Sequence, residues 1–186
     1  MMPLIVIPYN LGYPKVLPEG LTHGLGEVKH FNDIPGGGGR MAALARAFGM
    51  RVLCTTAHPT PERARRLGTE FVPLETLLHD ADFVSLHAAL DGQTRSLIGA
   101  KELALMKPTA YLVNTARAEV VDTAALAQAL REHRIAGAST DVWDHEPPAP
   151  DHPLLGLTNA VLAPHLGWNA DTAKWRMKDR PQPSGS

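Results

Sequence analysis

Three side chains that could bind an anion and move a proton follow apolar runs in the second half of the chain. Arg117 comes shortly after the run 110–113, Glu146 lies in D-V-W-D-H-E-P-P, and His165 lies in L-A-P-H-L-G-W. A guanidinium presents a planar fork of donors that suits a carboxylate, and an imidazole exchanges protons near neutral pH. A carboxylate beside the imidazole would hold the orientation of its ring. The trio therefore predicts a site that binds a small anion and transfers a proton.

Each of these residues, taken singly, also has a purely structural interpretation. An arginine after a strand is usually a surface ion-pair partner, and a glutamate among prolines usually belongs to an exposed loop. A histidine before Leu-Gly is ordinarily satisfied by a backbone carbonyl. Only the occurrence of all three residues, each just past an expected strand, favours the chemical interpretation.

Short apolar runs alternate with helical patterns along most of the chain. Such runs, bounded by proline or polar residues, are typical of buried strands in a parallel sheet, and the alternation predicts an α/β protein with a Rossmann-like, doubly wound sheet. Ligands of such sheets bind beyond the carboxyl ends of the strands. The expected strands are 4–7, 28–34, 51–55, 71–72, 82–86, 110–113, 137–140 and 160–163, and the expected helices are 40–48, 61–67, 74–79, 101–106 and 123–133, the last with Asp122 as its N-cap.

Four consecutive glycines, Gly36 to Gly39, precede the first expected helix. The pattern Gly37-x-Gly39-x-x-Ala42 matches the dinucleotide-binding fingerprint, whose third glycine can be alanine. The fingerprint requires a strand before the turn, but K-H-F-N-D-I-P is a poor central strand, so the first strand of the sheet is expected to be degenerate or truncated. Two interpretations stay open: a phosphate-binding loop, or a flexible joint left by a deletion.

The segment from about Phe48 to Thr172 resembles the D-isomer-specific 2-hydroxyacid dehydrogenases, a family that includes phosphoglycerate dehydrogenase and glyoxylate and hydroxypyruvate reductases. The motifs that carry this resemblance are D-A-D-F-V-S-L-H, T-R-S-L-I-G, L-A-L-M-K-P, L-V-N-T-A-R, D-V-W, H-P-L and A-P-H-L-G, in family order and at close to family spacing. The resemblance implies hydride transfer between NAD or NADP and the C2 carbon of a small 2-hydroxy or 2-oxo acid.

The resemblance also implies a role for each matching residue. Arg117 would bind the substrate carboxylate, His165 would be the general acid or base, and Glu146 would orient His165. Asp141 matches the family aspartate that contacts the nicotinamide carboxamide. Where the family has glycine after the arginine, this chain has Ala118. The residues expected to bind the cofactor are Gly37, Gly39, Arg40, Met41, Thr56, Thr115, Ala116, Asp141 and Gly167.

The choice between the two nicotinamide cofactors depends on Thr56. About 20 residues after the first glycine of the fingerprint, an Asp or Glu usually binds the adenosine ribose, and this chain has Thr56 instead. A site without that carboxylate does not repel a ribose 2′-phosphate, and Arg63 or Arg65 could lie near one. Alternatively, these arginines only form the solvated face of the helix 61–67. The prediction is therefore NAD or NADP.

The chain divides by composition and resemblance into three parts. Residues 1–35 are expected to be a remnant of an N-terminal substrate-binding lobe, residues 36–175 the cofactor-binding domain, and residues 176–186, rich in Pro, Ser and Gly, a disordered tail. Because most of the family's substrate domain is not recognisable, three functions stay open. They are a reduced dehydrogenase, a dinucleotide-binding or regulatory module without catalysis, and a truncated product with neither activity.

Composition and charge exclude several other classes. The formal net charge is −1 with mixed signs along the chain, which argues against nucleic acid or an anionic membrane as partner, and Cys54 is the single cysteine. No apolar stretch reaches the roughly 18 residues of a membrane span, and no His/Cys spacing indicates a metal site. We expect a cytoplasmic protein that acts on a small molecule. Apolar surface that a missing lobe would cover predicts self-association into a homo-oligomer.

Overall fold

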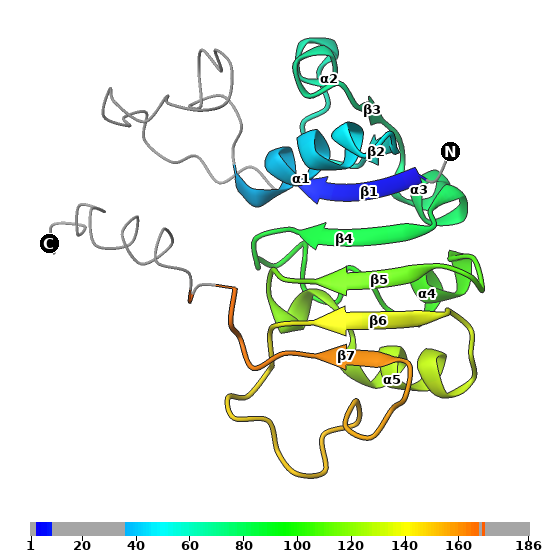
Figure 1. Cartoon of the computed structure of the whole chain (residues 1–186), viewed down its shortest axis with the longest axis vertical. Coiled ribbons are helices and arrows are strands. Elements are labelled where there is room, and N and C mark those ends of the chain that lie inside the picture. The colour runs from blue at the N-terminus through cyan, green and yellow to red at the C-terminus, as the bar shows by residue number, and fades with distance from the viewer. Residues whose placement is uncertain (1–2, 9–35, 168, 170–186) are drawn as a thin grey trace, which may run out of the picture.

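The computed structural model of this chain describes residues 3–8, 36–167 and 169. These residues form one parallel sheet of seven strands in the order β3-β2-β1-β4-β5-β6-β7 (Figure 1). The chain winds from the centre to one edge of the sheet and then from the centre to the other, which is the doubly wound topology. The predicted fold class is confirmed. The strands are β1 (Pro3–Pro8), β2 (Arg51–Cys54), β3 (Glu70–Phe71), β4 (Phe83–His87), β5 (Tyr111–Asn114), β6 (Gly137–Thr140) and β7 (Ala160–Leu162).

The helices alternate with the strands as the sequence predicts, with ends displaced by a few residues. They are α1 (Gly36–Ala47), α2 (Pro61–Leu67), α3 (Leu74–Asp80), α4 (Ala100–Leu105) and α5 (Thr123–Arg131), with a short 3-10 helix, η2 (Ala118–Val120), after β5. The predicted N-cap is present, because Asp122 Oδ1 accepts a hydrogen bond from Ala125 N at 3.0 Å. The strand expected at 28–34 and the tail at 176–186 lie outside the described residues.

Strand β1 lies inside the sheet, between β2 and β4. It pairs in parallel with β2, through Leu4 beside Val52, and with β4, through Leu4 beside Phe83. The position of the first strand of a dinucleotide-binding sheet is therefore filled by Pro3–Pro8. This placement differs from the assignment of residues 1–35 to a separate lobe, which stays a prediction for residues 9–35, outside the described part. The signal that sequence reasoning missed is non-local, because pairing with distant strands leaves no mark on the local pattern.

The four glycines belong to helix α1. The helix begins at Gly36 instead of the expected Arg40, and its first turn is made of glycine. Gly38 and Gly39 are buried, and Ala42 and Ala45 pack against Val52 and Cys54 of β2. The glycines are therefore helical where they are described, although glycine is a weak helix former. Tertiary packing of small residues against the sheet overrides that propensity. The binding of phosphate by Gly37 and Gly39 stays a prediction.

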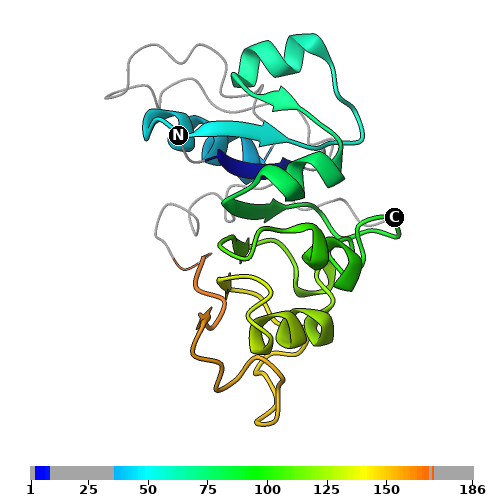
Figure 2. The same cartoon turned by 90° about the vertical axis from the view of Figure 1, so that its right-hand side faces the viewer.

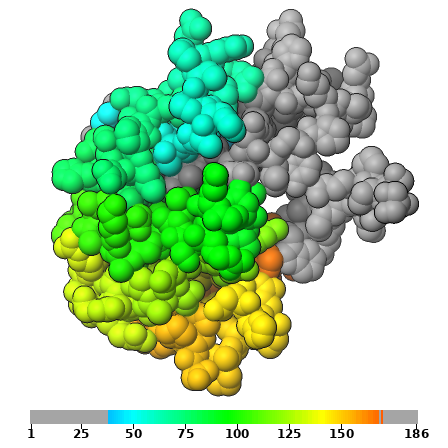
Figure 3. Space-filling view, turned by 180° about the vertical axis from the view of Figure 1, so that it is seen from behind, coloured from blue at the N-terminus to red at the C-terminus, as the bar shows by residue number. Residues whose placement is uncertain are grey.

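The sheet carries helices on both faces. Helix α1 lies on one face, and α3, α4 and α5 lie on the other (Figure 2). Seen from that second face, the residues of α3, α4 and α5 form a continuous surface over the strands (Figure 3). Between these helices and the sheet lies the main core, whose largest fully buried side chains are Leu53, Leu77, Leu78, Leu86, Ile98, Leu103, Leu112, Leu130 and Ile135.

Some large apolar side chains stay exposed on the described surface. Phe48 at the end of α1 is 84% exposed and Val161 on the edge strand β7 is 68% exposed. Such side chains are consistent with the predicted self-association, which stays a prediction. Among the described residues, no helix is long and apolar enough to span a membrane.

Gly137, the first residue of β6, lies where no side chain fits. A Cβ there would lie 2.8 Å from the carbonyl oxygen of Asn159 and 3.0 Å from the ring of Tyr111. The same Asn159 oxygen accepts a hydrogen bond from Ala138 N at 3.0 Å, so a displaced Asn159 also weakens the pairing of β6 with β7.

We predict that Gly137→Ala lowers the free energy of unfolding by about 1–3 kcal/mol, the usual cost of overpacking. Urea denaturation measures this change. The matched control is Gly92→Ala, because a Cβ at Gly92 meets nothing within 4 Å. Equal stability of the two variants would contradict the prediction.

Candidate active site

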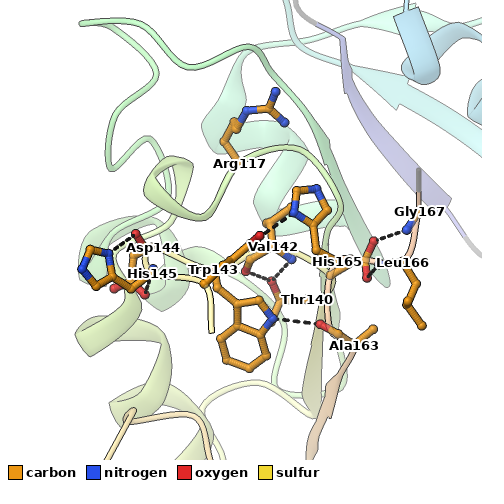
Figure 4. A network of polar contacts seen from close by, with 12 residues as sticks. Arg117, Thr140, Val142, Trp143, Asp144, His145, Ala163, His165, Leu166 and Gly167 are labelled. Carbon is orange, nitrogen blue, oxygen red and sulfur yellow. Dashed lines mark hydrogen bonds and ion pairs between the residues drawn. The ribbon is translucent and has the colours of Figure 1, made fainter. Parts of the chain in front are cut away.

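The three side chains singled out in the sequence follow three neighbouring strands. Arg117 follows β5, Glu146 follows β6, and His165 follows β7, and these strands lie side by side and parallel. Their carboxyl ends meet at one edge of the sheet, so the loops that carry the three residues lie at the same edge (Figures 1 and 4). The sheet topology thus gathers the residues that the sequence separates.

Asn114, the last residue of β5, shapes the loop that carries Arg117. Its side chain is buried, with Oδ1 accepting from Ala116 N at 3.0 Å and Nδ2 donating to Arg117 O at 2.9 Å. Both bonds satisfy backbone groups of the turn that the strand end leaves unpaired. Sequence reasoning did not assign Asn114 a role, although an Asn at a strand end before a turn is a known signal for this arrangement.

Arg117 presents an exposed guanidinium. Its Nη1 donates to the carbonyl oxygen of Ala116 at 2.7 Å. In Figure 4 the guanidinium does not point toward the imidazole of His165. No ion pair holds the Arg117 side chain among the described residues, so its remaining donors are available to an anion.

His165 and Glu146 form a hydrogen-bonded pair. His165 Nδ1 lies 2.7 Å from Glu146 Oε1. A carboxylate only accepts, so Nδ1 carries the shared proton and Nε2 is the nitrogen left to exchange a proton with a ligand. Within the described part of the chain, the side chains of His165 and Glu146 are 35% and 45% exposed. Water can therefore reach both side chains. This arrangement is one that can orient a general acid or base.

The residues expected to contact the cofactor lie along the same edge. Helix α1 starts beside the carboxyl ends of the strands (Figure 1), with Gly37 and Gly39 in its first turn and Arg40 and Met41 in the next. Thr56 follows β2, and Thr115 and Ala116 follow β5.

The side chain of Asp141 contacts the backbone of the segment that contains Gly167. Both oxygens of Asp141 are occupied, because Oδ1 accepts from Leu166 N and Oδ2 from Gly167 N, each at 2.7 Å. The expected contact of Asp141 with a carboxamide stays a prediction. Within the described ranges, no group of three His, Cys, Asp or Glu side chains could hold a metal ion.

A second histidine lies at this edge, at the end of β4. His87 Nε2 lies 2.9 Å from the hydroxyl oxygen of Ser85, and burial lowers the pKa of His87 below its ordinary value of 6.5. The imidazole is therefore neutral at neutral pH. Residues two apart in a strand share one face of the sheet, so the sequence could have indicated that Ser85 and His87 lie together.

Comparison with known proteins bears on this geometry directly. The model of the D-isomer specific 2-hydroxyacid dehydrogenase NAD-binding domain matches residues 36–167 of the chain. The chain belongs to this family. The resemblance drawn from the sequence is confirmed, and the described residues are a dehydrogenase-family NAD-binding domain, so a nicotinamide dinucleotide is the cofactor that the family assigns to them.

The dehydrogenase relatives agree over the same region. A glyoxylate reductase of Aeropyrum pernix is 46% identical over 140 residues, which are 75% of this chain and 42% of the relative. The structure of a glyoxylate reductase from Paecilomyes thermophila matches with a TM-score of 0.70 and 36% identity, covering 76% of this chain and 42% of that one. D-lactate dehydrogenase with NAD+ from Lactobacillus jensenii matches with a TM-score of 0.68 and 34% identity, covering 75% and 46%. The chain thus spans less than half the length of these relatives.

We predict that His87 makes the NAD-binding domain less stable in mild acid. Because its pKa is lower in the folded state than in the unfolded state, the unfolded chain takes up a proton first as the pH falls below 6.5. The free energy of unfolding therefore falls with pH from this value until the folded state also becomes protonated.

Urea denaturation at pH 7.5 and at pH 5.5 tests this prediction. His87→Gln should lose less stability than the parent between the two pH values, because glutamine does not titrate. His58→Gln, at an exposed position, is the control. The same loss of stability in the His87 variant and in the parent would refute the prediction.

Proposed function

We propose that this domain transfers a hydride between a nicotinamide dinucleotide and a small 2-oxo or 2-hydroxy acid, with glyoxylate as the substrate class to test first. The observation that carries this proposal is the 2.7 Å contact of His165 Nδ1 with Glu146 Oε1, at the edge of the sheet that also carries Arg117. The names of the matched relatives support the choice of acid, since several of them are glyoxylate reductases.

The residues present suit a dinucleotide. Helix α1 has no acidic residue in its first turn, and its glycines leave the backbone there bare. A helix N-terminus carries partial positive charge and unpaired N–H groups, which favour a pyrophosphate. Strand order reverses at β1 and β4, and dinucleotides bind at such a switch point. Gly37, Gly39, Arg40 and Met41 would therefore hold the phosphates, and Thr115 and Ala116 would line the nicotinamide side.

The chain's own side chains would supply binding and proton transfer. Arg117 would hold the substrate carboxylate through parallel hydrogen bonds and polarise the adjacent carbonyl. His165 would donate a proton from Nε2 to the 2-oxo oxygen during reduction and accept it during oxidation. Glu146 would keep the imidazole in the tautomer and orientation that this transfer requires. The bound nicotinamide supplies or accepts the hydride.

A second candidate function is dinucleotide binding without turnover. The exposure of the His165–Glu146 pair favours it, because hydride transfer is normally shielded from water by a closing domain or lid. The chain also spans 42% of the length of the glyoxylate reductase it matches. This function predicts NADH affinity with no oxidation of NADH by any 2-oxo acid.

We predict that substitution of each residue of the trio slows the oxidation of NADH or NADPH by glyoxylate. His165→Gln and Glu146→Gln should each lower kcat by about 10²–10⁴, the usual contribution of general acid–base catalysis. Arg117→Ala should raise KM for glyoxylate strongly, because the carboxylate loses its charged partner. Loss of absorbance at the reduced nicotinamide band measures these rates.

The control for the arginine variant is Arg51→Ala. Arg51 lies at the opposite edge of the sheet, where it forms an exposed ion pair with Glu70. A parent chain that oxidises no cofactor, yet binds it, would favour the second candidate function. Turnover that survives Arg117→Ala would count against the assignment of Arg117.

We also predict that Thr56→Asp shifts cofactor preference toward NADH. A carboxylate at this position hydrogen-bonds the ribose diol and repels a 2′-phosphate. Arg63 is one of the two arginines that could lie near a 2′-phosphate. Its Nη1 donates to the carbonyl oxygen of His58 at 2.6 Å, and its guanidinium lies 5.7 Å from the centroid of the Phe71 ring. Titration of tryptophan fluorescence with each cofactor gives the ratio of the two Kd values. The uncharged Thr56→Asn is the control, and a ratio unaltered by the aspartate would oppose the prediction.

A further inference from the structure

The segment that follows β6 contacts the backbone on both sides of His165. Asp141 accepts hydrogen bonds from Leu166 N and Gly167 N, each at 2.7 Å, and Trp143 Nε1 donates to Ala163 O at 2.9 Å (Figure 4). These three bonds attach residues 163, 166 and 167, so His165 lies in the middle of a short turn fixed at both ends. We call the two side chains, Asp141 and Trp143, the β6 clamp.

The turn needs an outside constraint because of its backbone conformation. His165 has a φ of 55°, in the left-handed region that residues with a Cβ rarely adopt. The turn belongs to no helix or strand, so regular backbone pairing does not fix this angle. Instead, the carboxylate of Asp141 accepts hydrogen bonds from the two backbone N–H groups that follow His165. The indole of Trp143 donates to the carbonyl oxygen of Ala163, two residues before His165.

Gly167 makes the close approach of the carboxylate possible. A Cβ at Gly167 would lie 2.9 Å from Asp141 Oδ2, a distance that real Cβ atoms essentially never show. Any larger residue would therefore have to displace either the carboxylate or the turn. The β6 clamp therefore requires a glycine at position 167 for a steric reason.

Trp143 is held on its other side by His152. The two rings meet edge to face with centroids 4.9 Å apart, and the side chain of His152 is only 7% exposed. His152 Nε2 in turn lies 3.4 Å from Asp144 Oδ1. The indole is therefore braced against the same loop that runs on to Glu146, so one segment positions both partners of the His165–Glu146 pair.

We propose that Asp141 and Trp143 are positioning residues that hold the left-handed turn at His165 and so aim its imidazole at Glu146. This inference rests on the proposed function for its catalytic consequence but not for its structural content. It gives Asp141 a task besides the expected contact with the cofactor, because the turn uses one acceptor site on each of its two oxygens.

Three variants of the full chain test the clamp. Asp141→Asn keeps the shape of the side chain but points an NH₂ donor at a backbone N–H. Trp143→Phe removes the indole donor and keeps an aromatic ring. Gly167→Ala displaces the carboxylate while leaving Asp141 in place. The control is Asp151→Asn, which removes the same charge from an exposed position of the following loop.

The first measurement does not depend on turnover. Nitrogen-15 NMR of the histidine rings, with the His165 signals assigned by His165→Gln, reports the hydrogen bond of Nδ1 to Glu146. The clamp predicts that this signature is lost in all three variants and retained in Asp151→Asn. Circular dichroism and the thermal midpoint identify any variant that fails to fold, and the conclusion then rests on those that fold. Retention of the signature in the folded variants overturns the proposal.

The second measurement separates positioning from cofactor contact. In Trp143→Phe, whose position is not among the expected cofactor contacts, a misplaced imidazole should lower kcat by about 10² while KM for glyoxylate and Kd for NADH stay unchanged. If Asp141→Asn instead weakens NADH binding and retains the His165 signature, Asp141 is a cofactor contact and the proposal is wrong. If the parent shows no turnover, the proposed function fails on its own, and the NMR result still decides for or against the clamp.

Discussion

Parallel pairing of β5, β6 and β7 is the constraint on which the site depends. Register sets Asn114 beside Thr140 and Thr140 beside Leu162, so the three strands end within a residue of one another. Their loops must then leave the sheet at one edge. A guanidinium, a carboxylate and an imidazole that are far apart in sequence come to one edge because the two ladders between these strands keep the strand ends aligned. The chemistry of the site is thus set by strand pairing before any side-chain contact is made.

Much of this could be predicted from local patterns. The run 110–113 is apolar and ends in polar residues, as burial on both faces of a parallel sheet predicts, and it corresponds to β5. The runs 82–86 and 137–140, which mix apolar or small residues with Ser and Thr, correspond to β4 and β6. The candidate residues after these strands followed from the general rule that ligands bind at carboxyl ends. Hydrophobic periodicity and capping residues predicted the helices equally well, as the N-cap Asp122 of α5 shows.

The parts that could not be predicted depend on contacts between distant residues. The local sequence does not indicate that Pro3–Pro8 pairs between β2 and β4, or that a run of glycines forms the first turn of α1. Packing against the sheet decides both. The engagement of Asp141 by Leu166 and Gly167 is also non-local. The sequence marked Asp141 through family resemblance, but the partners of its oxygens depend on how the loop after β7 folds back over β6.

Strand β1 lies between two halves of the sheet, so its pairing bears on how the sheet assembles. Strands β2 and β3 on one side and β4 to β7 on the other share no ladder, so β1 is the one hydrogen-bonded seam between the two halves in the described sheet. A tight turn usually connects such a strand to its helix, whereas residues 9–35 separate β1 from α1 here. Loop-closure entropy grows only logarithmically, by about 0.6 kcal/mol per doubling of length, so the longer link costs little stability. We expect it to affect the order of folding instead: each half can form from contacts close in sequence, and the pairing of β1 with β2 and β4 would then join the two halves.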